Sequence, residues 1–150
     1  MQIGDKVPDL LGYDENGNEV RLSQLGDKKL VLYFYPKDMT SGCTSQACSL
    51  RDNYQALQAQ GYEVLGVSVD PAQKHRQFIE KNQLPFHLIA DVEKTLVQQF
   101  GVWGEKKLYG RSYMGTLRTT FIIASDGTVE RIITPKEVKT KEHAQQILDN

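Results

Sequence analysis

Short runs of largely apolar residues alternate along this chain with segments in which apolar residues recur every three or four positions. A continuous apolar run predicts a strand that is covered on both faces of a sheet. Five such runs are present, at residues 30–35, 64–69, 86–89, 119–123 and 129–133. Asp126-Gly127, between the last two runs, predicts a hairpin turn.

The segment after the first run has the period of an amphipathic helix. Polar residues separate its apolar positions, which are Cys43, Ala47, Leu50, Tyr54 and Leu57. Spacings of three and four place these side chains on one face of a helix. We expect a single helix that begins near Cys43 and ends at Gly61.

Three more helices are expected. Asp70-Pro71 places a capping side chain and then a proline where the next helix starts, and that helix carries His75. Asp91 is expected to cap a helix that ends at Gly101. Residues 140–148 predict a terminal helix.

Two remaining segments complete the prediction. Residues 7–11 and 19–22 flank a turn signal at 14–18 and predict an N-terminal β-hairpin. Residues 102–117 are polar and lack a clear period, and we expect a long loop there. Strands that alternate with helices in this way predict an α/β fold with a central mixed sheet and helices on both faces. We expect one domain that spans residues 1–150, with the hairpin as an extension.

Composition and charge exclude some classes of function. The chain is 39% hydrophobic and 25% charged, which is typical of a globular protein, and its net charge is -1. This balance gives no overall electrostatic case for nucleic acid or an anionic membrane as a partner. The first residues lack the basic start and apolar run of a secretory signal, and only two cysteines are present. We therefore expect a reducing, cytoplasmic environment.

The two cysteines carry the most specific chemistry. Cys43 is predicted in the first turn of a helix that follows a central strand, where free backbone N–H groups and the helix dipole favour a thiolate. Buried structural thiols are the alternative, because free cysteine packs as a small hydrophobic residue. Cys48 points about 140° away from Cys43 on the helix and so lies off the packing stripe, where a purely structural thiol has less reason to be.

Other uses of a cysteine pair fit less well. A tetrahedral zinc site needs four ligands, and none of the histidines, His75, His87 and His143, has ligand spacing to the pair. A thioredoxin-type exchange site uses Cys-x-x-Cys spacing, whereas four residues separate this pair. A thiol-disulfide oxidoreductase and a non-enzymatic redox sensor remain alternatives to peroxide reduction.

The sequence around Cys43 resembles a known motif. Pro36, Thr40 and Cys43 fit the Pro-x-x-x-Thr-x-x-Cys motif of the peroxiredoxins. With Cys48 five residues on, the chain is similar to the PrxQ subfamily, also called bacterioferritin comigratory proteins. The resemblance extends to residues 101–107 and to Arg118. Members of that subfamily commonly have proline where Ser41 stands, a difference that would loosen the loop.

The resemblance implies a thioredoxin-like fold with an N-terminal extension and a thiol peroxidase that needs no cofactor or metal. It implies that Cys43 is the peroxidatic cysteine, which a hydroperoxide oxidises to sulfenic acid, and that Cys48 resolves it as an intramolecular disulfide. It also suggests thioredoxin as the reductant. An internal resolving cysteine removes the need for a second subunit, so we expect a monomer.

General chemistry agrees with the other residues that the motif names. Thiolate attack on a peroxide creates negative charge on the departing oxygen, which Arg118 and the hydroxyl of Thr40 could stabilise, while Pro36 would shield the pocket. Taken singly, such residues are usually turn formers or solvated charges. Their order around Cys43 favours a catalytic role, and Gln46 and Trp103 are expected to support the site.

The predicted helix has a consequence for the disulfide. Five residues along an α-helix place the Cα atoms of Cys43 and Cys48 about 8.6 Å apart. A disulfide tolerates a Cα separation of at most about 7 Å. We therefore expect oxidation to unwind the start of this helix.

Overall fold

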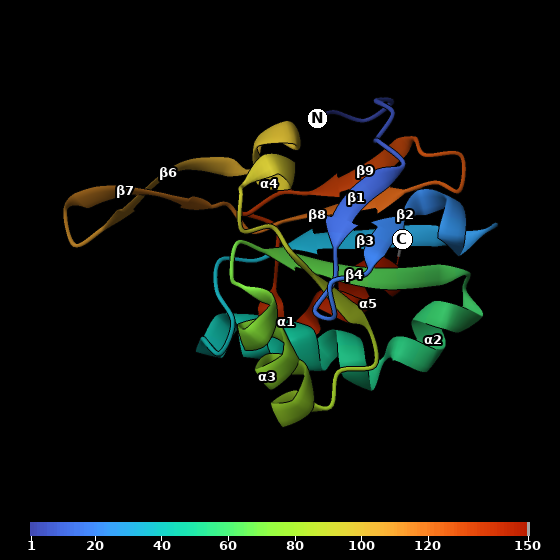
Figure 1. Cartoon of the computed structure of the whole chain (residues 1–150), viewed down its shortest axis with the longest axis horizontal. Coiled ribbons are helices and arrows are strands. Elements are labelled where there is room, and N and C mark those ends of the chain that lie inside the picture. The colour runs from blue at the N-terminus through green and yellow to red at the C-terminus, as the bar shows by residue number, and fades with distance from the viewer. Residues whose placement is uncertain (150) are drawn as a thin grey trace.

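A five-stranded mixed sheet forms the centre of the molecule (Figure 1). The computed structural model describes residues 1–149, and the strand order is β5-β4-β3-β8-β9. Strands β3, β4 and β5 are parallel, whereas β8 runs antiparallel to both β3 and β9. The strands span Lys29–Phe34 (β3), Tyr62–Ser68 (β4), His87–Ala90 (β5), Thr119–Ile123 (β8) and Val129–Ile133 (β9). Each coincides with one of the apolar runs.

Helices cover both faces of this sheet. Along β3, Val31 and Tyr33 join one buried cluster and Leu30 and Leu32 join the other, because successive side chains of a strand point to opposite faces. The first cluster is closed by α1 (Ser41–Asp52), α2 (Tyr54–Ala59), α3 (Ala72–Asn82) and α5 (His143–Leu148), and the second by α4 (Thr95–Gln99) and the N-terminal hairpin. The predicted mixed sheet flanked by helices is confirmed.

The N-terminal hairpin is also present. Strands β1 (Leu10–Tyr13) and β2 (Glu19–Arg21) pair antiparallel, and a 3-10 turn, η1 (Leu22–Leu25), follows them. The first strand begins later than predicted, because Val7 instead donates its N–H to the carbonyl of Gly127 in the β8–β9 turn. The terminal helix begins with a second 3-10 turn, η2 (Thr140–Glu142).

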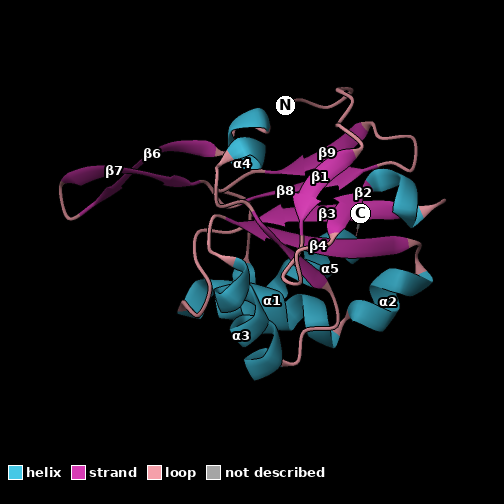
Figure 2. Ribbon diagram, in the orientation of Figure 1, coloured by secondary structure: helices cyan, strands magenta, loops and turns pink. Residues whose placement is uncertain are grey.

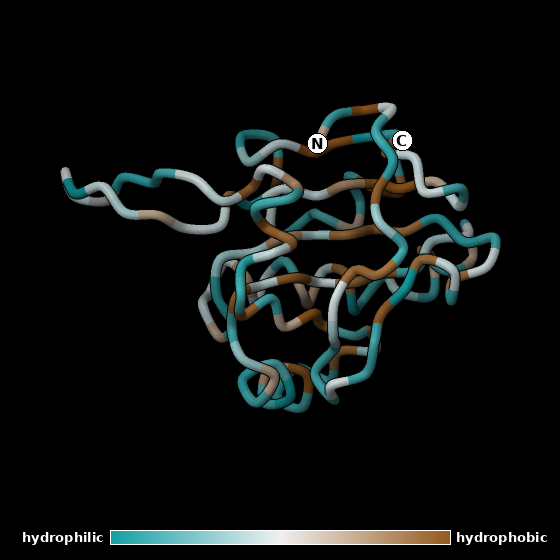
Figure 3. Tube along the Cα trace, turned by 45° about the horizontal axis from the view of Figure 1, so that its top comes forward, coloured by the Kyte–Doolittle hydropathy of each residue, from teal (hydrophilic) through white to brown (hydrophobic). Residues whose placement is uncertain are grey.

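The prediction of a loop over residues 102–117 is wrong. Strands β6 (Trp103–Leu108) and β7 (Arg111–Thr116) form a fully paired ribbon, which reverses at Tyr109 and Gly110, both with positive φ. Figure 2 shows it projecting away from the body of the molecule. In Figure 3 the central strands are largely brown, whereas the ribbon is mainly teal and white. Because the ribbon buries little, it has no apolar alternation to reveal it.

Two helix predictions need correction. The helix from Cys43 to Gly61 is two helices, α1 and α2, which meet at Asn53, where the side-chain amide donates to the carbonyl of Ser49 and competes with the helical bond pattern. Asp70 does not cap α3, which begins at Pro71 without a side-chain cap. Asp91 does cap α4, because its carboxylate accepts the N–H groups of Leu96 and Val97.

Within residues 1–149, no helix has both the length and the apolar character that crossing a bilayer requires.

Candidate active site

Cys43 lies in the first turn of α1 and is 1% exposed. Strand pairing explains why Arg118 meets it. Thr119, the first residue of β8, pairs with Phe34, the last residue of β3, so Arg118 lies at the edge of the sheet from which the chain enters α1. Its Nη2 lies 3.3 Å from the Sγ atom of Cys43. The sequence prediction that these two groups meet agrees with this geometry.

Gln46 and Gly42 hold the guanidinium of Arg118 in place. Gln46 lies one turn after Cys43 on α1 and is fully buried, and its Oε1 accepts a hydrogen bond of 2.6 Å from Nη1 of Arg118. A Cβ atom at position 42 would lie 3.3 Å from Nη2, so glycine leaves room for the guanidinium. Gln46 thus orients Arg118, in keeping with the supporting role expected of it.

Positive charge lies close to Cys43. The guanidinium of Arg118 contacts its sulfur, and the residue lies in the first turn of α1, where the helix dipole is positive. Lys106 of β6 belongs to the same region, since burial and the charge of Arg118 lower its pKa and its Nζ donates to the carbonyl of Thr116. Nothing in the sequence pointed to Lys106 beyond its place in the 101–107 run.

Thr40 and Pro36 lie on the loop between β3 and α1. Thr40 is the N-cap residue of α1, and its hydroxyl donates to the carbonyl of Lys37 at 2.9 Å. With its hydrogen used in that bond, the exposed hydroxyl offers lone pairs that can accept a hydrogen bond from the O–H of a hydroperoxide. Pro36 is half-buried directly after Tyr35. Trp103 lies elsewhere, packed with the core on the α4 side, where Lys94 Nζ is 5.5 Å from its ring centroid.

Cys48 is partly buried on the same helix, and both cysteines are free thiols. Its Sγ lies 3.9 Å from Oδ1 of Asn82 on α3. The guanidinium of Arg51, on the next turn, donates to the backbone carbonyl of Asn82 at 2.8 Å. Cys48 is therefore attached to α3 and does not face Cys43 in this state.

One cluster near β5 has the residue types of a metal site. Asp14, Glu15 and His87 place ligand-type atoms within 4.8 Å of one another. Glu15 already accepts hydrogen bonds from His87 Nδ1 at 2.7 Å and from the N–H of Leu88, and Asp14 accepts the N–H of Asn16. These bonds attach the N-terminal hairpin to the edge of the sheet and use the oxygens that would bind a metal.

The sequence did not predict one buried network of hydrogen-bonded side chains. Tyr35, Asp38 and His75 form a connected hydrogen-bond network under the loop that carries Pro36 and Thr40. No signal in the sequence distinguished these residues from ordinary core and loop positions.

Residues 3–132 match the AhpC/TSA family. The chain belongs to this family. It is 44% identical over 149 residues to Peroxiredoxin Bcp of Bacillus subtilis and 40% identical over 149 residues to Peroxiredoxin Bcp of Escherichia coli, which cover 99% of the chain and 93% and 94% of those relatives.

Solved structures of peroxiredoxins have the same fold. Peroxidoxin BcpB from Mycobacterium tuberculosis is 36% identical with a TM-score of 0.87, over 99% of this chain and 95% of that one. A bacterioferritin comigratory protein from Xanthomonas campestris, studied for its alkyl peroxide reduction activity, is 30% identical with a TM-score of 0.84, over 97% and 96% of the chains. The expected thioredoxin-like fold and the assignment to the thiol peroxidases, which reduce hydroperoxides, are confirmed.

Proposed function

We propose that Cys43 is the peroxidatic nucleophile of this thiol peroxidase. The observation that supports it most is the 3.3 Å approach of Arg118 Nη2 to the sulfur of a cysteine in the first turn of α1. The Cys43 thiolate attacks one peroxide oxygen, so that an S–O bond forms as the O–O bond breaks. The attacked oxygen keeps its hydrogen, while the departing oxygen takes the electron pair and a proton from solvent and leaves as water or an alcohol. The product on the enzyme is a sulfenic acid.

Arg118, Thr40 and Pro36 assist that step in this proposal. Two guanidinium N–H groups are directed towards Cys43 and Gln46, so the fork is fixed before a peroxide arrives. A fixed charge costs little reorganisation when negative charge develops on the departing oxygen. Thr40 accepts a hydrogen bond from the O–H of the peroxide as it binds, and Pro36 limits access of water.

Cys48 then resolves the sulfenic acid. Its sulfur attacks the oxidised sulfur of Cys43, a disulfide forms and the sulfenic oxygen leaves as water. Both cysteines are on α1, and five residues of helix separate their Cα atoms by about 8.6 Å, more than a disulfide permits. The first turns of α1 must therefore unwind before resolution.

The reductant and the setting are part of the same proposal. A disulfide exposed on an unwound helix suits a small dithiol protein, and we propose thioredoxin. The whole cycle uses residues of one chain, which supports a monomer built as one domain over residues 1–150, and two free thiols suit the cytoplasm. Hydrogen peroxide and organic hydroperoxides are the proposed substrates. The 1% exposure of Cys43 favours such small molecules over a protein disulfide as its first partner.

Turnover in a coupled assay tests the proposal. With thioredoxin, thioredoxin reductase and NADPH present, the wild type should consume peroxide, and Cys43→Ser should show only background consumption because serine supplies no thiolate. Circular dichroism would confirm that the variant is folded. Substantial peroxidase turnover by folded Cys43→Ser would contradict the assignment.

A further inference from the structure

Two side chains of the loop between β3 and α1 are buried, Tyr35 at its start and Asp38 within it. In residues 36–40, Asp38 is 3% exposed, whereas Pro36 is half-buried and the other three are exposed. The Thr40 hydroxyl bonds to the carbonyl of Lys37, so the end of the loop is closed on itself. Asp38 also donates its backbone N–H to the carboxylate of Asp70 at 2.7 Å. Asp38 is thus the residue that fastens this loop to the sheet edge.

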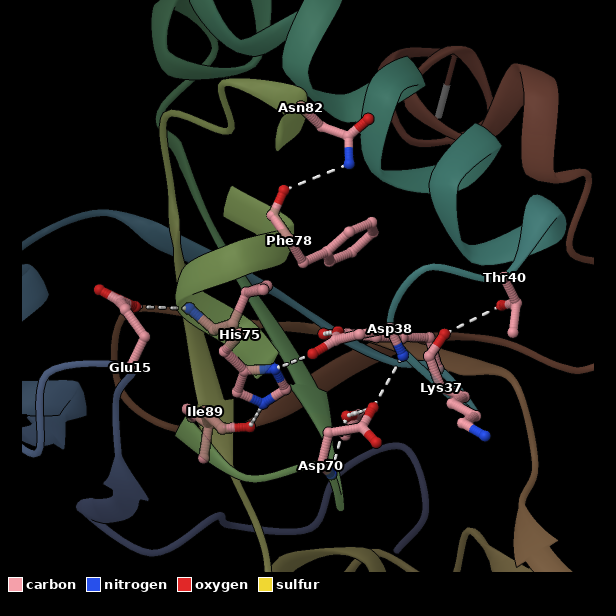
Figure 4. Close-up of polar contacts among 12 residues, drawn as sticks. Glu15, Lys37, Asp38, Thr40, Asp70, His75, Phe78, Asn82 and Ile89 are labelled. Carbon is pink, nitrogen blue, oxygen red and sulfur yellow. Dashed lines mark hydrogen bonds and ion pairs between the residues drawn. The ribbon is translucent and has the colours of Figure 1, made fainter. Parts of the chain in front are cut away.

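The carboxylate of Asp38 extends the attachment into the core (Figure 4). Its Oδ1 accepts a hydrogen bond of 2.5 Å from the hydroxyl of Tyr35, and its Oδ2 lies 2.5 Å from Nδ1 of His75 on α3. On the other side of the ring, Nε2 of His75 lies 2.9 Å from the carbonyl oxygen of Ile89 on β5. A continuous chain of hydrogen bonds therefore connects the loop, α3 and β5.

The bonding partners fix where the protons are. The carbonyl of Ile89 can only accept, so Nε2 of His75 carries a hydrogen. Burial, with the nearby Asp38 carboxylate, raises the pKa of Tyr35 well above its usual value, so its hydroxyl keeps the hydrogen that it donates to Asp38. The contact between Asp38 Oδ2 and His75 Nδ1 then requires one more proton between them. The two side chains therefore form a single hydrogen-bonded unit.

Stability is a poor explanation for such a unit. Tyr35, Asp38 and His75 are all almost completely buried, and moving ionisable groups out of water carries a desolvation cost. An apolar set of the same size would often be as stable, whereas a hydrogen-bonded set fixes positions. We propose that Asp38 and His75 are positioning residues that set the loop, and with it Thr40 and Pro36, for peroxide to approach Cys43. This inference rests on the proposed function.

The geometry of the loop makes its position sensitive. Met39, directly after Asp38, has a φ of +69°, a left-handed conformation that is unfavourable for a side chain of this kind. Thr40 then returns to extended backbone and begins α1, three residues before Cys43. If Asp38 lost its partners, the loop would relax at Met39, and Thr40 would move relative to the sulfur.

Substitutions at Asp38 test whether its hydrogen bonds, rather than its burial alone, set the position of the loop. Asp38→Ala removes both side-chain bonds, and we expect the second-order rate constant for oxidation of Cys43 by peroxide to fall about tenfold or more, since small misplacements are costly. Asp38→Asn keeps an oxygen for Tyr35 and offers an amide N–H to neutral His75, and should restore the rate to within about threefold. Reduction of the preformed disulfide by dithiothreitol should be unchanged in both.

Asp91→Ala is the matched control. Asp91 is also a buried aspartate that accepts two hydrogen bonds, but these come from Leu96 and Val97 of α4, which pack in the other core cluster from Tyr35. Asp91→Ala should lower the melting temperature, while its rate constant for oxidation of Cys43 by peroxide should equal that of the wild type. If Asp38→Ala does not fold, Tyr35→Phe takes its place, because it removes one bond to Asp38 and keeps the ring, and it should slow oxidation about threefold.

The outcomes are distinct for the two hypotheses. If wild type oxidises Cys43 rapidly and a folded Asp38→Ala, or Tyr35→Phe in its place, does so at the same rate, the positioning role is wrong and the proposed function stands. If peroxide leaves the wild-type Cys43 unoxidised, the proposed function itself fails.

Discussion

The structure places the guanidinium of Arg118 against the sulfur of Cys43. Its two contacts, to Cys43 Sγ and to Gln46 Oε1, use both arms of the guanidinium and leave it little freedom. A lysine at this position would keep the positive charge but could not make both contacts in the same plane. The charge of Arg118 and the planar shape of its guanidinium therefore make separate contributions to the site, which substitutions can distinguish.

Substitutions of Arg118 separate the contribution of its charge from that of its shape. Arg118→Ala should slow oxidation of Cys43 by about 10²-fold or more, the usual effect of removing a fixed group that stabilises developing negative charge. Arg118→Lys should recover part of that loss. Stopped-flow rates of Cys43 oxidation would measure both, with Arg111→Ala on the exposed β6–β7 ribbon as the matched control. Equal rates for wild type and Arg118→Ala would remove Arg118 from the site.

His87 predicts a dependence of stability on pH. Although burial acts in the opposite direction, the hydrogen bond to Glu15 and the charges of Glu15 and Asp14 raise the pKa of His87. Protonated His87 therefore stabilises the folded state. Its contribution is complete below the unfolded value of about 6.5 and is lost as pH rises through the raised folded pKa.

Thermal unfolding between pH 5.5 and 8.5 would reveal this contribution. We expect the melting temperature of wild type to fall with rising pH more than that of His87→Gln, by a small amount because 61% of the side chain is exposed. Parallel curves for the two proteins would show that this ion pair adds nothing to stability.

At the scale of residues, the sequence pointed to candidate reactive groups but not to the residues that hold them. A motif of fixed spacing singled out Cys43 and Thr40, and the resemblance that extends to residue 118 singled out Arg118. The contact of Asp38 with His75 joins residues that are 37 positions apart, and that of Arg118 with Gln46 joins residues 72 apart. Such contacts depend on how β8, α1 and α3 meet at the sheet edge, and one sequence carries no record of that.

At the scale of elements, α1 is the helix that must unwind in the proposed cycle. It carries both cysteines and is held in place on three sides. Arg51 bonds to the end of α3, Ser49 accepts the N–H of Ala144 at the start of α5, and Cys43, Ala47 and Leu50 pack into the core. Resolution has to break part of this arrangement, so we expect the start of α1 to be less stable than the rest of the fold.

Hydrogen exchange would detect the opening of α1. After oxidation to the intramolecular disulfide, amides from Cys43 to Asp52 should exchange faster than in the reduced protein, while the strands of the sheet stay protected. Cys48→Ser treated with the same peroxide is the control, because it cannot form the bond and should keep its protection. Unchanged protection in oxidised wild type, with the disulfide confirmed, would show that α1 does not unwind.

Elements were predictable where burial leaves a pattern. All five strands of the sheet and the stripe on α1 follow from the periodicity of apolar residues, since each faces one or both cores. The β6–β7 ribbon was missed because most of β7 is exposed and leaves no alternation of apolar residues. The break at Asn53 was missed because the apolar stripe continues across it from Leu50 to Tyr54.

At the scale of the whole molecule, the fold brings three distant segments to one edge of the sheet. The loop after β3, the segment before β8 and the start of α3 all lie there, because the parallel strands end at this edge and β8 begins at it. The order of strands and helices was enough to predict a mixed sheet with two covered faces. The proposed function depends on one claim at this scale, which is that Cys43 and Cys48 of a single chain complete the catalytic cycle.

Mass mapping after a single turnover tests that claim most directly. Reduced wild type would be treated with one equivalent of hydrogen peroxide, alkylated and digested without reducing agent. We predict a monomer that has lost two hydrogen atoms, with Cys43 and Cys48 joined in one peptide or linked pair of peptides. Cys48→Ser under the same conditions should carry sulfenic acid on Cys43. A Cys48 that is alkylated in full while Cys43 is oxidised further, or a disulfide that joins two chains, would contradict the account.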